Sequence, residues 1–134
     1  MFAAPVNRPG HILITGGAGF IGANLAAHLL AATDARITIL DDLSQAGAEL
    51  NVQWLRSQAL AARLRFLRGD VRSAVRVMEA MRDADEIYHL ASRGEASVES
   101  PADFEVNVTG TLNVLEAARC SRHKPVVFYV STAK

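Results

Sequence analysis

The clearest candidates for chemistry are the glycines of the run Thr15-Gly16-Gly17-Ala18-Gly19-Phe20-Ile21-Gly22. The run follows a short apolar segment and opens a helical pattern, so its G-x-G-x-x-G spacing has the context of a dinucleotide-binding turn. Gly16 and Gly17 permit backbone angles forbidden to other residues, and Gly19 permits close approach of a pyrophosphate. Gly22 would let the helix pack close to the strand, and N–H groups of the first helical turn would bind phosphate. The alternative is a tight strand-to-helix turn without a ligand.

Two adjacent acids, Asp41 and Asp42, form the second candidate. Asp41 comes about 20 residues after Gly22, at the end of the apolar run 37–40, where dinucleotide-binding folds place an acid against the adenosine ribose. A carboxylate at this position accepts hydrogen bonds from the ribose hydroxyl groups and repels a 2′-phosphate. The sequence therefore favours NAD over NADP, unless Asp41 is an ordinary acidic residue at a strand end.

Strands and helices must position both candidates, and the hydrophobic pattern indicates where they lie. Short apolar runs alternate with longer amphipathic ones, which is typical of a parallel sheet covered by helices. We expect strands, buried on both faces, at residues 11–15, 36–40, 64–67, 86–90 and 126–130. We expect helices at residues 20–32, 48–62, 73–82 and 102–120. Right-handed crossovers with a reversal after the third strand predict an α/β fold, a Rossmann-type doubly wound parallel sheet of order 3-2-1-4-5, truncated after the fifth strand.

Two of these helices carry an apolar stripe at helical spacing. The stripes are Ile21, Leu25 and Leu29 in helix 20–32, and Val108, Leu112 and Leu115 in helix 102–120. The connection 91–101 is longer and more polar than the others. It would lie at the carboxyl edge of the sheet, where open α/β folds bind ligands.

Length, composition and charge exclude several classes of protein. The chain has 134 residues, of which 50% are hydrophobic, so it suits one globular domain and not a disordered segment. Its 14 Lys and Arg balance 14 Asp and Glu, so charge indicates neither nucleic acid nor a membrane as a partner. The arginines in the middle of the chain are interpreted as a solvated face and not as a phosphate clamp: Arg56, Arg63, Arg65, Arg68, Arg72, Arg76 and Arg82.

The single cysteine, Cys120, indicates a reducing compartment. It has no partner for an internal disulfide and no Cys or His at metal-ligand spacing, so we expect no metal. No apolar stretch reaches the roughly 20 residues needed to cross a bilayer, and residues 1–10 lack the apolar core of a signal peptide. We therefore expect a cytoplasmic protein.

Together, the motifs resemble the extended short-chain dehydrogenase/reductases, the NAD-dependent sugar-nucleotide epimerases and dehydratases. After the opening run 12–22, further matches follow in the family's order along nearly the whole chain. They are Asp41-Asp42-Leu43-Ser44, Arg68-Gly69-Asp70-Val71, Tyr88-His89-Leu90-Ala91, Asn107-Val108-Thr109-Gly110-Thr111 and Ser131-Thr132. Within the family, the segments 47–55, 103–105 and 131–134 look most similar to the CDP-paratose 2-epimerases.

The resemblance implies a role for each residue along a bound NAD. The residues around the pyrophosphate would be Gly16, Gly19, Phe20, Ile21 and Gly22. The adenosine ribose would be held by Asp41 and Asp42, and the adenine by Asp70 and Val71. The ribose near the nicotinamide would be lined by Leu90 and Ala91, with Asn107 as a polar brace below the active site.

Four of these residues also have a structural explanation. Val71 and Leu90 could belong to the core. Asp70 could cap the third helix, and Asn107 could satisfy a buried backbone group. These alternatives stay open at the level of the sequence.

Thr132 matches the catalytic Ser/Thr of the family, whose hydroxyl group hydrogen-bonds the sugar oxygen that is oxidised. The family pairs this residue with a general acid/base Tyr and with a Lys four residues later, which lowers the pKa of the Tyr. The only tyrosines here are Tyr88 and Tyr129, and neither is followed by such a Lys. We therefore expect residues 1–134 to form an incomplete NAD-binding Rossmann domain that lacks the substrate-binding region and is inactive by itself.

The resemblance implies the NAD-binding part of an enzyme that transfers hydride to and from a sugar carbon of a CDP- or UDP-sugar. The alternative is a non-catalytic dinucleotide-binding module or the remnant of a truncated gene. The resemblance also implies a homodimer, because family members often pair through the helix at 102–120.

Overall fold

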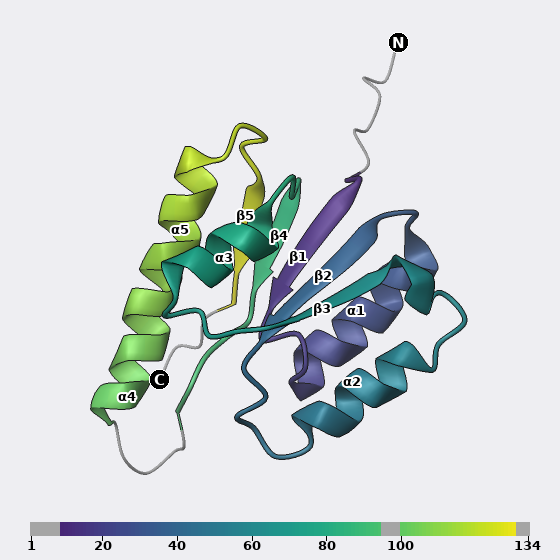
Figure 1. The fold of residues 1–134 in the computed structure, drawn as a ribbon, viewed down its shortest axis with the longest axis horizontal. Coiled ribbons are helices and arrows are strands. Elements are labelled where there is room, and N and C mark those ends of the chain that lie inside the picture. The colour runs from purple at the N-terminus through teal and green to yellow at the C-terminus, as the bar shows by residue number, and fades with distance from the viewer. Residues whose placement is uncertain (1–8, 95–99, 131–134) are drawn as a thin grey trace.

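The computed structural model describes residues 9–94 and 100–130. Within these ranges the chain forms one parallel sheet in the order β3-β2-β1-β4-β5, which confirms the predicted Rossmann-type fold (Figure 1). The strands are β1 (His11–Thr15), β2 (Arg36–Asp41), β3 (Leu64–Arg68), β4 (Glu86–His89) and β5 (Val126–Tyr129). The helices are α1 (Phe20–Ala32), α2 (Ala48–Arg56), α3 (Ala74–Met81), α4 (Pro101–Phe104) and α5 (Thr111–Cys120).

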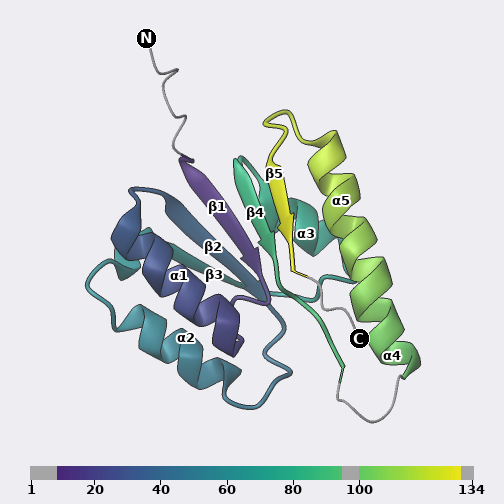
Figure 2. The ribbon, with the colours of Figure 1, turned by 180° about the vertical axis from the view of Figure 1, so that it is seen from behind.

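Helices cover both faces of the sheet. Figures 1 and 2 show α1 and α2 on one face, and α3 and α5 on the other. The side chains of β1 are shared between the two layers: Ile12 and Ile14 pack with α1, whereas Leu13 packs with α3 and α5. All three side chains are fully buried. This explains why the central strands are continuous apolar runs without alternation.

The expectation that every strand is buried on both faces is wrong for the edges of the sheet. In β5, Val126 and Tyr129 are 55% and 56% exposed, and β3 is only partly covered. In the described part of the chain, α1 packs on β1 and β2, and no helix covers β5 on that face (Figure 2). Apolar composition alone does not distinguish a covered strand from an edge strand.

Most element boundaries agree with the prediction to within a residue or two. The exception is α2, which ends at Arg56 and not at residue 62. Ser57 Oγ and Gln58 Nε2 both donate to the carbonyl oxygen of Trp54, so polar side chains satisfy the end of the helix. A separate 3₁₀ turn, Ala61–Arg63, then leads into β3.

The helix predicted at 102–120 begins at Pro101 and is not uniform. Its start is a capping box: Ser100 Oγ accepts from the N–H of Asp103, and the Asp103 carboxylate accepts from the N–H of Ser100. Between α4 and α5, the segment Glu105–Gly110 is π-helical. Such segments occur frequently at functional sites.

The predicted apolar stripe of α1 lies partly on the buried face, since Leu29 is buried and Leu25 packs against the core, whereas the stripe of the last helix faces outward. Residues buried in α1 are Gly22, Ala23, Ala26, Leu29 and Leu30, whereas Ile21 is 64% exposed. In the last helix the buried positions are Val106, Gly110, Val114 and Ala118. The stripe of Val108, Leu112 and Leu115 is 47%, 62% and 49% exposed. In the last helix, small residues allow close approach to the core, so a pattern read from large side chains selects the wrong face there.

Arg63 does not belong to a solvated face. Its guanidinium donates to the carbonyl oxygens of Leu30, Thr33 and Ala35, which satisfies carbonyl groups at the end of α1 and in the loop before β2. Arg65 does lie at the surface, where it pairs with Glu79.

Two further findings concern residues 9–94 and 100–130. No helix there is long and apolar enough to cross a membrane. No group of three His, Cys, Asp or Glu side chains in these ranges lies close enough together to hold a metal ion. Cys120 is a free, exposed thiol.

Candidate dinucleotide-binding groove

A groove of about 340 Å³ lies at the carboxyl edge of the sheet, between the glycine turn, the ends of β2 and β3, and the loop after β4. The predicted cofactor-binding residues that line it are Gly16, Gly19, Phe20, Ile21, Gly22, Asp41, Asp42, Asp70, Val71, Leu90 and Ala91. Open α/β sheets bind their ligands at this edge, where the strand order reverses. The structure therefore brings these residues together, while their individual roles stay predictions.

The glycine turn has contacts that a side chain would disrupt. Gly16 has a φ of 68°, and its N–H donates to the Leu40 carbonyl oxygen at 2.9 Å. A Cβ on Gly17 would lie 2.7 Å from the side chain of Ile39. Gly17 has no positive φ, so the expectation of a forbidden backbone angle is wrong there and packing is the reason. A Cβ on Gly22 would overlap the Gly16 carbonyl oxygen, so Gly22 packs against the turn itself.

The N-terminus of α1 is open toward the groove. Gly19 precedes this helix and provides no side-chain cap. Apart from its chain neighbours, a Cβ on Gly19 would meet only the Gly16 carbonyl oxygen, at 3.3 Å. Phe20 and Ile21, in the first turn, are 82% and 64% exposed. Uncapped N–H groups at the positive end of a helix dipole have the geometry that binds a phosphate.

Asp41 connects the glycine turn to the loop after β2. Its Oδ2 accepts from the N–H of Ala18 at 3.0 Å, and its Oδ1 accepts from the N–H of Leu43 at 2.8 Å. The Ala18 carbonyl oxygen in turn accepts from the Asn51 side chain of α2 at 2.7 Å. A carboxylate has about four lone-pair sites, so Asp41 can brace the glycine turn and still accept from a ribose hydroxyl group.

The electrostatics of this end of the groove are negative. Burial raises the pKa of Asp41 above its usual value, against the effect of its two N–H bonds, and the neighbouring Asp42 adds to the increase. Asp42 Oδ1 accepts from the N–H of Ser44 at 2.9 Å, which directs this second carboxylate to the same turn. Two adjacent carboxylates oppose the approach of a further anion.

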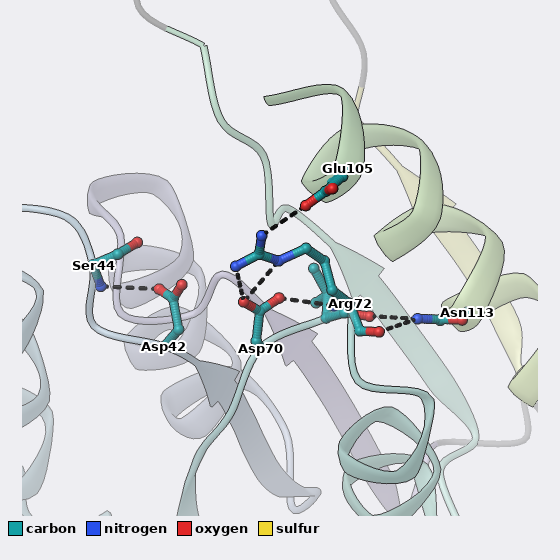
Figure 3. A network of polar contacts seen from close by, with 7 residues as sticks. Asp42, Ser44, Asp70, Arg72, Glu105 and Asn113 are labelled. Carbon is teal, nitrogen blue, oxygen red and sulfur yellow. Dashed lines mark hydrogen bonds and ion pairs between the residues drawn. The ribbon is translucent and has the colours of Figure 1, made fainter. Parts of the chain in front are cut away.

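Arg72 forms a bridge at the side of the groove that Asp70 and Val71 line. Figure 3 shows its guanidinium between Asp70, after β3, and Glu105, in the π-helical segment. Nη2 donates to Asp70 Oδ2 at 2.6 Å, and Nη1 donates to Glu105 Oε2 at 3.0 Å. The hydrogen bond from Arg72 lowers the pKa of the Asp70 carboxyl. The alternative that Asp70 caps α3 is wrong, because the cap is Ser73, whose hydroxyl accepts from the N–H of Arg76.

The last helix fixes the backbone beside this bridge. Asn113 Nδ2 donates to the carbonyl oxygens of Val71 and Arg72, both at 2.9 Å (Figure 3). Gly110 leaves room for Val71, because a Cβ there would lie 2.6 Å from Val71 Cγ2. Val71 is 5% exposed and belongs to the core, and it also lines the groove. Val71 is therefore a core residue that also lines the groove, and its contact with adenine stays a prediction.

Asn107 does not line the groove and instead holds one of its walls. Its Oδ1 accepts from the N–H of Arg93 at 2.9 Å, and its Nδ2 donates to the Arg93 carbonyl oxygen at 2.6 Å. Arg93 and Ser92 line the groove beside Ala91. Asn107 thus satisfies backbone groups of the exposed Arg93 and not a buried group as its structural explanation expects, and in doing so it fixes the loop after β4.

Comparison with known protein families shows to which family the chain belongs. A model of the NAD dependent epimerase/dehydratase family matches residues 12–134. The chain belongs to this family. The resemblance predicted from the motifs is therefore confirmed, and so is NAD as the family's cofactor.

Individual relatives agree with this assignment. The chain is 38% identical over 128 residues to the CDP-paratose 2-epimerase of Salmonella typhi, a match that covers 92% of this chain and 37% of that protein. It is 37% identical over 127 residues to a dTDP-glucose 4,6-dehydratase of Mycolicibacterium smegmatis, covering 90% and 36%. The chain therefore spans little more than a third of the length of these relatives.

A solved structure of the family has the same fold. It is DesIV, a dTDP-glucose 4,6-dehydratase from Streptomyces venezuelae with NAD and TYD bound. The TM-score is 0.71 at 33% identity, and the match covers 81% of this chain and 35% of that one.

Other groove residues were not predicted from the sequence. They are Leu40, Ser44, Gln45, Gly69, Ser92, Arg93, Val106 and Val130. Adjacency to Asp41 and Asp70 could have indicated some of them, and Ser92 and Arg93 lie in the polar loop that the sequence assigns to this edge. Thr132, the predicted catalytic residue, lies outside the described residues.

Proposed function

We propose that this chain is the NAD-binding part of a nucleotide-sugar epimerase or dehydratase. The observation that carries the proposal is the groove at the carboxyl edge, where the uncapped N-terminus of α1 lies opposite Asp41. The names of the two curated relatives refer to CDP- and dTDP-linked sugars. They support a nucleotide sugar as substrate of the complete enzyme, and we expect a CDP- or UDP-sugar.

The residues of the groove suit a dinucleotide whose adenosine half lies beside Asp41 and whose nicotinamide half lies beside Ala91. The pyrophosphate would lie over Gly19 and the first turn of α1. The adenosine ribose would lie beside Asp41 and Asp42, with its hydroxyl groups donating to their carboxylates. The adenine would lie between Asp70 and Val71, and the nicotinamide end beside Ala91. When bound, NAD would supply a hydride acceptor and donor for a sugar carbon. The chain itself positions the two ends and excludes a 2′-phosphate.

Titration with both cofactors tests this assignment. We expect NAD to bind more tightly than NADP, because Asp41 accepts from the ribose hydroxyl groups and repels a 2′-phosphate. Asp41→Ala should weaken NAD binding by roughly 1.5 to 3 kcal/mol, the range for hydrogen bonds to charged groups. Isothermal titration calorimetry measures both quantities.

Asp34→Ala is the matched control, because Asp34 is an exposed acid in the loop before β2, at the opposite edge of the sheet. It should leave NAD affinity unchanged. Circular dichroism of Asp41→Ala shows whether the loss of the Ala18 and Leu43 contacts also disturbs the fold. Equal or tighter binding of NADP by the unmodified chain would contradict the role of Asp41.

We further propose that two copies of the chain pair through the last helix. Its exposed stripe of large apolar side chains is Phe104, Val108, Leu112 and Leu115, all between 47% and 64% exposed. An apolar stripe of this kind suits helix-to-helix packing. Leu112→Lys should convert a dimer to a monomer in sedimentation velocity, while Leu50→Lys, at an exposed leucine of α2, should not. A monomeric unmodified chain at high concentration would refute the pairing.

A further inference from the structure

His89 lies at the end of β4, buried between two hydroxyl groups. Its side chain is 1% exposed. Nδ1 lies 2.6 Å from Oγ1 of Thr15, at the end of β1, and Nε2 lies 2.9 Å from Oγ1 of Thr111, the first residue of α5. The ring also stacks on Tyr129 of β5, with 5.6 Å between the ring centroids. One imidazole therefore contacts β1, β5 and α5.

The surrounding bonds determine the direction of each hydrogen bond. Thr111 Oγ1 donates its hydrogen to the Asn107 carbonyl oxygen at 2.6 Å, and a hydroxyl group has only one hydrogen to donate. Toward His89 the same oxygen must accept, so Nε2 carries a proton. Burial lowers the pKa of His89 to about 4, so the ring is neutral near pH 7 and its Nδ1 is an acceptor.

The chain of bonds continues on the other side of the ring. Because Nδ1 accepts, the Thr15 hydroxyl group donates to it. Thr15 Oγ1 in turn accepts from the N–H of Ala91 at 3.3 Å. The four hydrogen bonds therefore form one series with a single direction. The N–H of Ala91 donates to Thr15, the Thr15 hydroxyl group to His89, the His89 Nε2–H to Thr111, and the Thr111 hydroxyl group to the carbonyl group of Asn107.

Both ends of this series reach the same loop. Ala91 is the second residue of the loop after β4, and the Asn107 side chain bonds the N–H and carbonyl groups of Arg93 in that loop. Ala91 and Arg93 form a wall of the groove. The series therefore ends at two residues, Ala91 and Asn107, that each hold a part of one wall.

We propose that His89 is a positioning residue for the dinucleotide: as the neutral Nε2–H tautomer, it holds Thr15 and Thr111 so that the loop from Ala91 to Arg93 stays in place as a wall of the groove. The inference rests on the proposed function, because it assigns His89 to the groove in which NAD would bind. It adds a residue that lines no part of that groove and acts through two hydroxyl groups.

A second buried histidine provides a matched comparison. His11 is 3% exposed, and its Nε2 lies 2.8 Å from Oγ1 of Thr38. This pair lies on β1 and β2 away from the groove lining. Thr38→Val and Thr111→Val therefore each remove the threonine hydroxyl group that pairs with a buried histidine. Thr38 is fully buried and Thr111 is partly buried, and only Thr111 belongs to the series that reaches the groove.

The experiment measures thermal stability and NAD affinity for both variants of the full chain. We expect both to lose stability, and only Thr111→Val to bind NAD more weakly, by about tenfold, which corresponds to about 1.4 kcal/mol. Thr111→Ser, which keeps the hydroxyl group, should restore most of the affinity. If the series had a purely structural role, Thr38→Val and Thr111→Val would lose stability without a difference in NAD affinity between them.

Nitrogen-15 NMR of the unmodified chain tests the tautomer independently of any variant. We expect the His89 ring to carry its proton on Nε2 near neutral pH, and a proton on Nδ1 would overturn the proposal. Unchanged NAD affinity in Thr111→Val, with binding by the unmodified chain, would refute the positioning role alone. Failure of the unmodified chain to bind NAD would refute the proposed function as well.

Discussion

Gly19→Val is expected to lower the affinity for NAD by about 100-fold or more while the chain stays folded. The backbone of Gly19 has a φ of −69°, which a valine can adopt. The added side chain would occupy the open space above the first turn of α1, where a pyrophosphate must approach the main chain. A 100-fold loss corresponds to about 3 kcal/mol, the upper end of the usual cost of overpacking. Calorimetry gives the affinity, and circular dichroism of the same sample gives the fold.

Gly10→Val is the matched control at the opposite end of β1. Its Cβ would lie 3.5 Å from Asp85 Oδ2, an ordinary contact, so both fold and NAD affinity should be kept. Gly22→Val provides the contrast, because its Cβ would overlap the Gly16 carbonyl oxygen and should disturb the turn itself. Unchanged affinity in a folded Gly19→Val chain would mean that the glycine turn binds no pyrophosphate.

The sequence predicts well those residues of the site that lie near one another along the chain. β1 and α1 have the predicted boundaries, and the glycine turn between them follows from local steric rules. Asp41 is predictable for a similar reason, since the length of one strand-helix-strand unit sets its distance from the turn. In both cases the deciding interactions lie within one supersecondary unit.

Contacts between distant segments are the part that could not be predicted. The bridge from Arg72 to Glu105 joins residues 33 positions apart, and its partner depends on where the last helix lies against α3 and the connection before it. His89 and Thr111 likewise meet only because β4 and α5 pack together. An arginine or threonine in the sequence carries no signal of such a partner. Arg72 is exposed, as the sequence predicts, but its bridge to Asp70 and Glu105 could not be predicted.

The apolar pattern predicts where helices and strands lie better than it predicts which of their faces is buried. Leu112 and Leu115 do mark a helix, but the face toward the sheet is built from Val106, Gly110 and Val114. Close approach of backbone to core favours small residues there. Large apolar residues are then left for contacts with something other than the described sheet, which is why the outward stripe supports a second copy as partner.

The purified 134-residue chain is expected to turn over no nucleotide sugar at a rate comparable to a complete relative, even when it binds NAD. General acid/base assistance is typically worth about 10² to 10⁴ in rate, and neither tyrosine of the sequence suits that role. Tyr88 donates to Glu86 and stacks on Phe128, and burial raises its pKa, whereas a catalytic base needs a lowered pKa. Tyr129 stacks on His89 and has no lysine four residues later.

Orientation of the sugar against the nicotinamide contributes even more, roughly 7 to 11 kcal/mol of the barrier, and the chain spans little more than a third of the relatives that achieve it. The assay uses NAD with CDP-, UDP- and dTDP-linked sugars, and the CDP-paratose 2-epimerase of Salmonella typhi serves as the positive control under the same conditions. NAD binding without turnover agrees with a cofactor-binding part whose catalytic groups lie elsewhere. Turnover within tenfold of the control would show that residues 1–134 contain a proton-transfer group other than Tyr88 and Tyr129. His89 would not supply this group, because both of its ring nitrogens already form hydrogen bonds with hydroxyl groups.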